Sequence, residues 1–455
     1  MSKPVIPHSM VLEEENQPLP GHYSRNRFMS TEGVTSSIST INIPASRNSY
    51  LNAKDSFLVF TAQVEVEGTV LDKDSILLDP SGCAAMIKSI TVLNNNSVVQ
   101  YLDSYAKIHS MLHTAQADVD SRGIEAVLSG TSNLNGLVLT DSYGCAMIGQ
   151  PLNEYGTFVT DTATKIKTAE MTFTLPLLGL LSEGVIPLAF LTEGLVLRIQ
   201  WQNDVRNFVY AYNTLVPTTT GSITTPGKLE ITRCSFDAAI SVLDDAAQLL
   251  VEKENGYKSR PTEWSGKSYL AAVRTSTAQE LATSTTAEYN IGGYTFSSLC
   301  NIHYGSFTLP VGDSNPPNIP HIAHSLRYRI NAIERPREYI DSLSKAVQHT
   351  ACTISSVSQS VACGLMNNLY TSANFRTIET PSAANIKFTD RGVIGVALND
   401  FASANLISGL NTQGGEVIAQ LRTKTVTTTK RMNTYFVATF DVVYVIEDGI
   451  MKLSF

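Results

Sequence analysis

The sequence predicts an all-β protein made of antiparallel β-sandwiches or barrels with a few short helices. Along several segments, apolar residues alternate with polar ones, which is the period of a strand with one buried face. These segments are short and are separated by turn residues, a pattern typical of antiparallel sandwiches rather than of alternating strands and helices. The chain has 455 residues, enough for two to three domains.

The clearest strand pattern lies in the first half of the chain. Its apolar positions are Leu58, Phe60, Ala62, Val64 and Val66, with polar residues alternating from Thr61 to Glu67. Residues 87–99 predict a hairpin that turns at Asn94-Asn95-Asn96. Further strands are predicted at 171–175, 195–201 and 435–446, and a short last segment at 451–455 follows a turn.

Three helices are predicted, and all of them are short. The first rests on the spacing of Tyr101, Tyr105, Ile108 and Leu112, which puts them on one helical face. The second spans residues 244–253, with acidic residues at its start and Lys253 at its end, as the helix macrodipole favours. The third spans residues 341–350.

A Thr-rich segment at residues 214–228 divides the chain near its midpoint. It contains two prolines and two glycines and has no apolar period, which is typical of a linker. Prolines and glutamates dominate the first twenty residues, which suits an extended arm. The predicted organisation is an N-terminal arm at 1–40, a first domain at 41–216, a linker at 217–228 and a second domain at 229–455.

The composition is poor in charge. Only 16% of residues are charged, against roughly 25% in ordinary soluble domains. The net charge is −8, of which −7 lies in residues 1–228 and −1 in residues 229–455. Neutralising phosphates takes clustered Lys and Arg, so a sequence-specific nucleic-acid binder is not expected.

Cysteine usage and the N-terminus indicate synthesis in the cytoplasm. The six cysteines form no CxxC pair and are too few for a disulfide scaffold, so we expect small buried thiols. They are Cys83, Cys145, Cys234, Cys300, Cys352 and Cys363. The first thirty residues lack the apolar core of a signal peptide, and no segment approaches the roughly 20 apolar residues of a membrane span.

Two motifs resemble functional sites in part. Gly266-Lys267-Ser268 matches the end of a phosphate-binding P-loop, but the glycine required at 261 is Pro261. His109 and His113 have the i, i+4 spacing of a zinc pair on a helix, but no glutamate lies between them to act as a base. We therefore predict no catalytic, cofactor-binding or metal-binding residue, and no cofactor.

The remaining candidates also have structural explanations. His321 and His324 lie in a Pro-rich region without a neighbouring Cys or acidic residue. Asp244-Asp245 lies where a helix start favours acidic side chains. Arg327, Arg329, Arg335 and Arg337 form the densest positive cluster. We expect this cluster to contact an acidic protein surface, favouring the acidic first half of the chain.

Several segments resemble the double-jelly-roll major capsid proteins of tailless icosahedral DNA viruses, a family that includes those of polinton-like viruses, virophages and nucleocytoplasmic large DNA viruses. Residues 171–201, MTFTLPLLGLLSEGVIPLAFLTEGLVLRIQW, resemble the end of the first roll. The shared pattern is Leu175-Pro176-Leu177, Gly179 and Ile186-Pro187-Leu188 before a Leu-x-Leu-x-Ile strand. Both prolines suit strand ends, because proline cannot donate to a ladder.

Further similar segments follow in the family's order. SGCAAMIKSITVLNNNSVVQYLDSYAKIHSML resembles the strand–turn–strand–helix early in the first roll. LEITRCSFDAAISVLDDAAQLLVEK resembles the opening of the second roll, and SSLCNIHYGSF and SLRYRINAIERPREYIDSLSKAVQHT resemble its middle. LISGLNT at 406–412 and the strand at 435–446 complete the order. The chain departs from the pattern at Ile330-Asn331-Ala332, where relatives often have a glycine.

The resemblance implies two consecutive eight-stranded antiparallel jelly rolls with a few short helices. It also implies a major capsid protein that forms pseudo-hexameric homotrimers, which tile an icosahedral virion shell. Its partners would be neighbouring capsomers and penton and minor capsid proteins, and an internal membrane is left open. Long loops at 115–170 and 305–325 would form outer towers or clasps between subunits. A surface with few long charged side chains fits large protein interfaces.

Two other functions remain as alternatives. One is a carbohydrate-binding or adhesin-type β-sandwich, which would be expected to carry a signal peptide and disulfides. The other is a β-sandwich glycoside hydrolase, which needs a carboxylate pair in an aromatic-lined cleft. The chain has only two tryptophans, Trp201 and Trp264, which weakens the second alternative.

Overall fold

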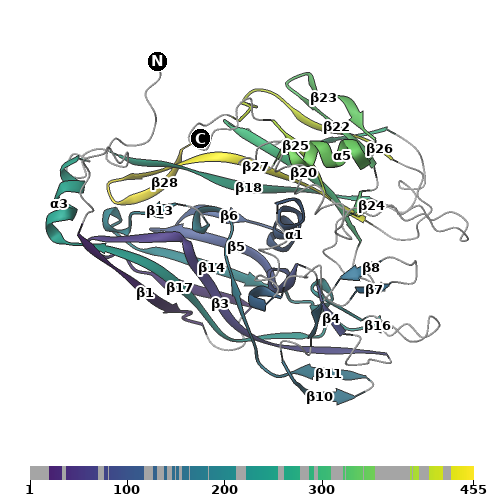
Figure 1. Ribbon diagram of the computed structural model, residues 1–455, viewed down its shortest axis with the longest axis horizontal. Coiled ribbons are helices and arrows are strands. Elements are labelled where there is room, and N and C mark those ends of the chain that lie inside the picture. Colours follow the sequence, from purple (N-terminus) through teal and green to yellow (C-terminus); the bar gives the residue numbers. More distant parts are fainter. Residues whose placement is uncertain are drawn as a thin grey trace, which may run out of the picture.

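The fold is all-β, as predicted, and every strand pairing among the described residues is antiparallel. It is seen in a computed structural model (Figure 1). The structure describes residues 20–32, 37–69, 76–79, 81–116, 127–130, 138–140, 146–148, 150–152, 156–162, 164–182, 184–211, 222–254, 261–276, 286–291, 296–308, 321–322, 324–341, 343–353, 390–391, 393–398, 409–423 and 432–454.

Two sheets form the first roll. The β3 sheet has the order β1-β17-β3-β11-β10, with three further short strands pairing with β3. Its strands are β1 (Gly21–Met29), β17 (Lys228–Leu243), β3 (Ser49–Thr69), β11 (Lys165–Thr168), β10 (Phe158–Thr162), β12 (Met171–Leu175), β13 (Val185–Ile186) and β16 (Ser222–Ile223). The β14 sheet has the order β2 (Ile38–Ile43), β14 (Leu195–Trp201), β5 (Ile87–Asn94) and β6 (Ser97–Leu102).

Two further sheets form the second roll. The β27 sheet contains β18 (Thr262–Ser276), β27 (Met432–Glu447), β20 (Leu299–Thr308), β21 (His321–Ile322), β24 (Asp390–Arg391), β25 (Ile394–Ala397) and β28 (Ile450–Ser454). The β22 sheet has the order β19 (Thr286–Asn290), β26 (Val417–Thr423), β22 (His324–Ile330) and β23 (Ile333–Ile340). Small sheets are formed by β4 (Ile76–Leu78), β9 (Gln150–Pro151) and β15 (Val209–Ala211), and by β7 (Val138–Thr140) and β8 (Ala146–Ile148).

The three predicted helices are present, and each begins one to four residues later than predicted. They are α1 (Tyr105–Gln116), α3 (Asp245–Glu254) and α5 (Leu343–Ala351). Tyr101 lies on strand β6 and is 53% exposed, so the apolar spacing of the first helix begins at Tyr105. Short 3-10 turns occur at η3 (Gly82–Met86), η5 (Gly179–Leu181), η6 (Leu188–Phe190) and η7 (Val205–Asn207).

The alternating pattern from Leu58 to Val66 is buried as predicted. All five apolar positions have no exposed surface and belong to the core of the first roll, where the Phe60 ring packs against Phe173 of β12 and Trp201 of β14. Strands β12 and β13 end immediately before Pro176 and Pro187, as predicted for strand-end prolines. The second roll has its own core between the β27 and β22 sheets, in which Tyr304, Tyr328 and Phe436 meet.

The sheets do not divide where the domain boundaries were predicted. Strand β17 (Lys228–Leu243) was assigned to the second domain, but it lies between β1 and β3 in the first roll. Strand β1 and the start of β2 fall within the predicted arm at 1–40, yet both belong to sheets of the first roll. The ladder with β3 determines the place of β17, and nothing in the local sequence at 228–243 reveals that distant partner.

Two tight turns use residues with positive φ. Asn95 and Asn96 (φ 47° and 59°) join β5 to β6, and asparagine tolerates this left-handed region well. Asn331 and Ala332 (φ 50° and 66°) join β22 to β23, where the sequence departs from the capsid-protein pattern. Alanine at this φ carries a steric strain that glycine would not.

We expect Ala332→Gly to raise the free energy of unfolding by about 1 kcal/mol, because glycine adopts φ 66° without a Cβ clash. The measurement is the midpoint and slope of urea unfolding. Ala246→Gly, at an exposed position of α3, is the matched control and should lower stability by about 0.5–1 kcal/mol. If Ala332→Gly destabilises the protein as the control does, the hypothesis that Ala332 strains this turn is wrong.

Candidate assembly surfaces

The first surface is the junction between the two rolls. One face of the β27 sheet packs on the β22 sheet, and residues of its other face join the apolar core of the first roll. Those junction residues include Tyr269, Tyr435, Val437, Tyr444 and Met451. Strands β18 and β28 lie against β6 of the first roll, and β27 lies against α1 (Figure 1). Because the β27 sheet has two buried faces, the rolls form one continuous packed unit.

Gln100 of β6 links three segments across this junction. Its side-chain Oε1 accepts a hydrogen bond from the backbone N–H of Leu180 at 2.9 Å, and its Nε2 donates to Ser268 Oγ on β18 at 3.3 Å. Gly179, with φ 81°, leaves the space that the amide occupies, since a Cβ there would lie 2.2 Å from Nε2. The buried amide is thereby satisfied at both ends, which a buried polar group requires.

Asn94, at the other end of the β5–β6 hairpin, makes a second such link. Its Nδ2 donates to the carbonyl oxygens of Glu193 and Gly194 at 2.9 and 3.1 Å, and its Oδ1 accepts from Met451 N–H of β28 at 2.8 Å. The side chain is fully buried. The turn between β27 and β28 adds a contact, because Thr192 N–H donates to the Gly449 carbonyl at 2.9 Å.

Sequence reasoning missed Gln100 and Asn94 as functional residues. Asn94 lies in the turn of the predicted hairpin and Gln100 directly follows that hairpin, but their partners on β28 and β18 are 357 and 168 residues further along the chain. A single sequence has no local feature that pairs them.

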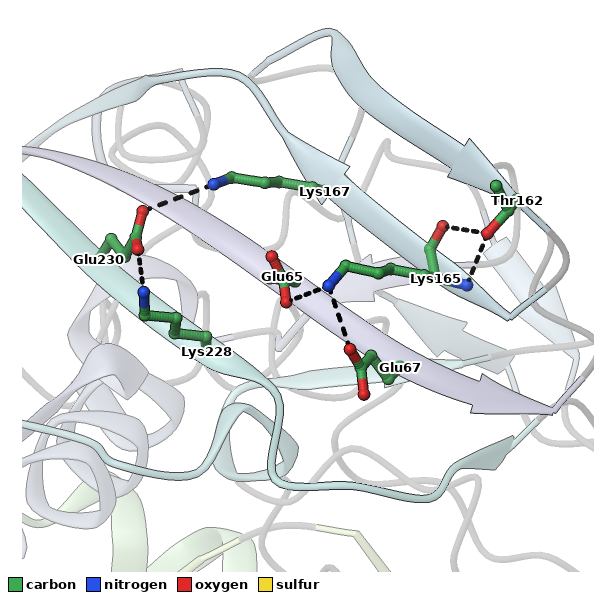
Figure 2. Close-up of polar contacts among 7 residues, drawn as sticks. All are labelled: Glu65, Glu67, Thr162, Lys165, Lys167, Lys228 and Glu230. Atoms are coloured by element: carbon green, nitrogen blue, oxygen red, sulfur yellow. Dashed lines mark hydrogen bonds and ion pairs between the residues drawn. The ribbon is translucent and has the colours of Figure 1, made fainter.

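The second surface is the outer face of the β3 sheet, which carries a ladder of opposite charges (Figure 2). Its members are Glu65 and Glu67 on β3, Lys165 and Lys167 on β11, and Lys228 and Glu230 on β17. Lys165 Nζ lies 2.6 Å from a Glu65 oxygen, and Lys228 pairs with Glu230. The hydrogen bond from Lys228 lowers the pKa of the Glu230 carboxyl. Three cations and three anions leave this ladder neutral, and each exposed pair adds only about 0–1 kcal/mol.

The third surface is the outer face of the β22 sheet, where the predicted arginine cluster lies. Arg327 and Arg329 alternate with buried Leu326, Tyr328 and Ile330, as expected for a strand with one charged face. Among the described residues, neither arginine pairs with an acidic residue of the first half of the same chain, and contact with an acidic surface of another molecule stays a prediction. Their ion-pair partners are Glu334 and Glu288, both in the second roll. These ion pairs are determined by which acidic side chains lie within reach on the same sheet, and the net charge of each half of the chain does not predict them.

On the same face, the ring of Tyr339 contacts two arginine side chains. The guanidinium groups of Arg327 and Arg422 lie 4.4 and 3.8 Å from the centroid of the Tyr339 ring. Arg327 also donates to Gln420 Oε1 at 2.5 Å, and Gln420 donates in turn to Glu288 at 2.6 Å. These contacts fix the side chains of the sheet face before any partner arrives, which lowers the entropy cost of binding.

The partial motifs do not assemble into sites. Gly266-Lys267-Ser268 lies within strand β18, so it is not a phosphate-binding loop. The rings of His109 and His113 stack on α1 with centroids 6.0 Å apart. Among the described residues no group of three His, Cys, Asp or Glu side chains could hold a metal ion. The side chains of His321 and His324 lie outside what the structure describes.

The cysteines follow the expectation in part. Cys83, Cys234 and Cys300 are buried, and burial raises the pKa of each thiol. Cys352 is exposed, which differs from the prediction. Cys145 and Cys363 lie outside the described residues.

His303 of β20 is a fully buried histidine that the sequence did not single out. Its Nε2 lies 3.1 Å from Thr353 Oγ1, and that hydroxyl donates to the Thr350 carbonyl at 2.6 Å. The hydroxyl proton is therefore used, so Nε2–H is the donor and Nδ1 carries the lone pair. Among the described residues Nδ1 has no partner. Burial lowers the pKa of His303 to about 4, because water does not reach the charged form.

Large apolar side chains are exposed mainly on strands at the sheet margins and on α3. The most exposed are Val127, Val159, Val98, Ile333, Leu250, Tyr23 and Tyr101. No helix among the described residues has the length and apolar content of a membrane span.

Comparison with solved structures identifies the fold. A chain of the Sputnik virophage superposes with a TM-score of 0.63 at 10% identity, covering 98% of this chain and 92% of that one. The Faustovirus major capsid protein gives 0.58 at 9% identity (97% and 93% covered), and the mavirus major capsid protein gives 0.56 at 12% identity (95% and 90%). No protein-family model and no curated protein matches the sequence. The chain therefore has the double-jelly-roll fold, as the resemblance in sequence implied.

We expect Gly449→Ala to destabilise the protein more than Gly414→Ala. Both glycines have φ near 78°, so alanine costs about 1 kcal/mol or more at either position. A Cβ at 449 would also lie 1.8 Å from Thr192 Oγ1 across the junction, whereas no atom lies within 4 Å at 414. Urea unfolding should show a further loss of about 1–3 kcal/mol at 449. Equal losses would mean that the junction contact is unimportant.

We expect the protein to lose stability between pH 6.5 and 4 because of His303. The unfolded state binds the proton near pH 6.5 and the folded state only near 4, so stability is full above 6.5 and falls as the pH drops. The loss is about 3 kcal/mol. His303→Gln should remove this part of the pH dependence, as measured by urea unfolding at pH 7 and 4. His22→Gln, on the exposed strand β1, is the control and should leave the profile unchanged.

Proposed function

We propose that this chain is a major capsid protein whose copies assemble into trimers that tile an icosahedral virion shell. The observation that supports it most is the agreement of the double-jelly-roll fold over nearly the full length with virophage and large-virus capsid chains.

The roll–roll junction supports a trimer as the building block. Two similar rolls held in one unit present six rolls around a threefold axis, which approximates a hexagonal tile. The buried links at Gln100 and Asn94 hold the two rolls at one fixed angle. Closed cyclic oligomers need such a fixed angle between their contact surfaces.

The surface chemistry fits a structural role rather than a catalytic one. On the outer faces of the β3 and β22 sheets, Lys165, Lys228, Arg327 and Arg329 each pair with a glutamate and do not form a convergent cluster of unpaired acids and bases. Trp201 is 2% exposed and donates its Nε1–H to Ser39, and Trp264 stacks on Tyr444. Trp201 is thus committed to the core, which weighs against the sugar-binding and glycoside hydrolase alternatives.

We also propose the finer points that the capsid role implies. The protein is made in the host cytoplasm and is located in the virion, with penton and minor capsid proteins as further partners. The chain is acidic overall, and the charge ladder on the β3 sheet is neutral, so the genome is retained by other proteins, counterions or an internal membrane. The two rolls divide within residues 244–261, after β17 and before β18.

We expect the purified chain to form trimers at micromolar concentration, as measured by sedimentation velocity, and particles to appear by electron microscopy under assembly conditions. Removing residues 1–19 should leave trimers intact while reducing shell formation, because the first sheet strand begins at Gly21.

The comparison is a chain lacking residues 1–29, which also loses β1 and its whole ladder with β17. This variant should lose stability as well as assembly. A wild-type protein that stays monomeric at these concentrations would overturn the capsid proposal.

A further inference from the structure

We infer that the β10 edge of one copy docks against the first residues of β23 in the next copy, with Val159 beside Ile333 and Asp161 beside Arg335. This inference rests on the proposed function, since it names the contact that would close the trimer. It uses residues that neither the fold nor the roll–roll junction employs.

Both strands are open sheet edges. The β3 sheet ends at β10, which pairs only with β11, and the β22 sheet ends at β23, which pairs only with β22 among the described strands. An open edge invites association unless the chain blocks it. Pro336 removes one backbone donor from β23, so the contact that we infer involves side chains at residues 333–335 and no continuous ladder.

Each edge carries an apolar side chain that water surrounds in the single chain. Val159 is 67% exposed and Ile333 is 57% exposed, and these are among the most exposed large apolar side chains described. Burying each against the other would stabilise a contact by roughly 1–2 kcal/mol.

Each edge also carries an unused charge two residues further along. Asp161 is exposed on β10, and Arg335 is half-buried on β23. Among the described residues neither has an ion-pair partner, whereas Arg327 and Arg329 on neighbouring β22 are both paired. On both edges an exposed apolar residue is followed two positions later by a charged one, and the charge is negative on β10 and positive on β23.

The open edge at β1 lacks this property. Tyr23 and Met29 are exposed there, but Arg25 and Arg27 both pair with Asp237 of β17 at 3.6 and 3.7 Å. Strand β1 therefore offers no unpaired charge to match.

The positions of the two edges determine the kind of oligomer. Figure 1 shows β10 and β23 at opposite margins of the chain, across all four main sheets. A contact between opposite ends of identical molecules is head-to-tail, and such contacts form a closed ring when the rotation closes. The occupant of each edge is thus a second copy of this chain. The fixed roll–roll angle then sets how many copies complete the ring.

The test is a charge swap, with the trimer fraction measured by sedimentation velocity at several protein concentrations. We expect Asp161→Arg and Arg335→Glu each to weaken the trimer by about 10-fold or more, since each places like charges at the contact. The double variant, with both changes in one chain, should recover trimers. Arg198→Glu, on an exposed position of β14, makes the same charge change elsewhere and should leave the trimer unchanged.

Each failure has a separate meaning. Monomeric wild-type protein would overturn the capsid proposal itself. If the wild-type protein forms trimers and the single variants do so equally well, only this contact is overturned. The same holds if the single variants weaken the trimer and the double variant does not restore it. Equal weakening by Arg198→Glu would also overturn it, because the effect would then be one of net charge. Urea unfolding of each variant separates lost assembly from lost folding, and Val159→Ser and Ile333→Ser provide a second, uncharged pair of tests.

Discussion

The burial of the β27 sheet on both faces is the constraint on which the rest of the structure depends. A sheet of an ordinary sandwich buries one face, so its strands alternate apolar and polar residues. In β27 the alternate positions serve two cores, with Phe436 and Ala438 facing the second roll and Tyr435 and Val437 facing the first. Neither face can be exposed without a large cost, and the two rolls therefore cannot separate as independent domains.

Polar links make this apolar contact specific. The hydrophobic effect has no preferred direction, so two apolar sheet faces can slide or rotate over one another. The amides of Gln100 and Asn94 each have donors and acceptors that only one arrangement satisfies. A shifted roll would leave these buried groups without partners, at a cost of about 1–3 kcal/mol each. The junction thus combines an apolar contact for affinity with buried amides for geometry.

Local patterns in the sequence were sufficient to predict helices, strands and turns, but not to predict which distant segments they contact. The alternation at Leu58–Val66, the hairpin at Asn95-Asn96 and the helix at 245–254 depend on neighbours within a few residues, and all three are present. The place of β17, the partners of Arg327 and the burial of His303 depend on strands far along the chain. The assembly residues are the least accessible to sequence reasoning, because an exposed valine or an unpaired arginine is defined only by what the fold leaves uncovered.

Strand β17 has a consequence for the order in which the protein can be made. It holds β1 in place along nine residue pairs and covers one edge of β3, yet it follows the Thr-rich segment that marks the chain's midpoint. A ribosome that has released only the first 227 residues has therefore produced an incomplete β3 sheet with an open central edge. The first roll cannot mature until its last strand emerges, and the second roll begins to emerge directly behind it. Completion of one roll and the start of the other are coupled during synthesis, which shortens the time in which a half-built chain could aggregate.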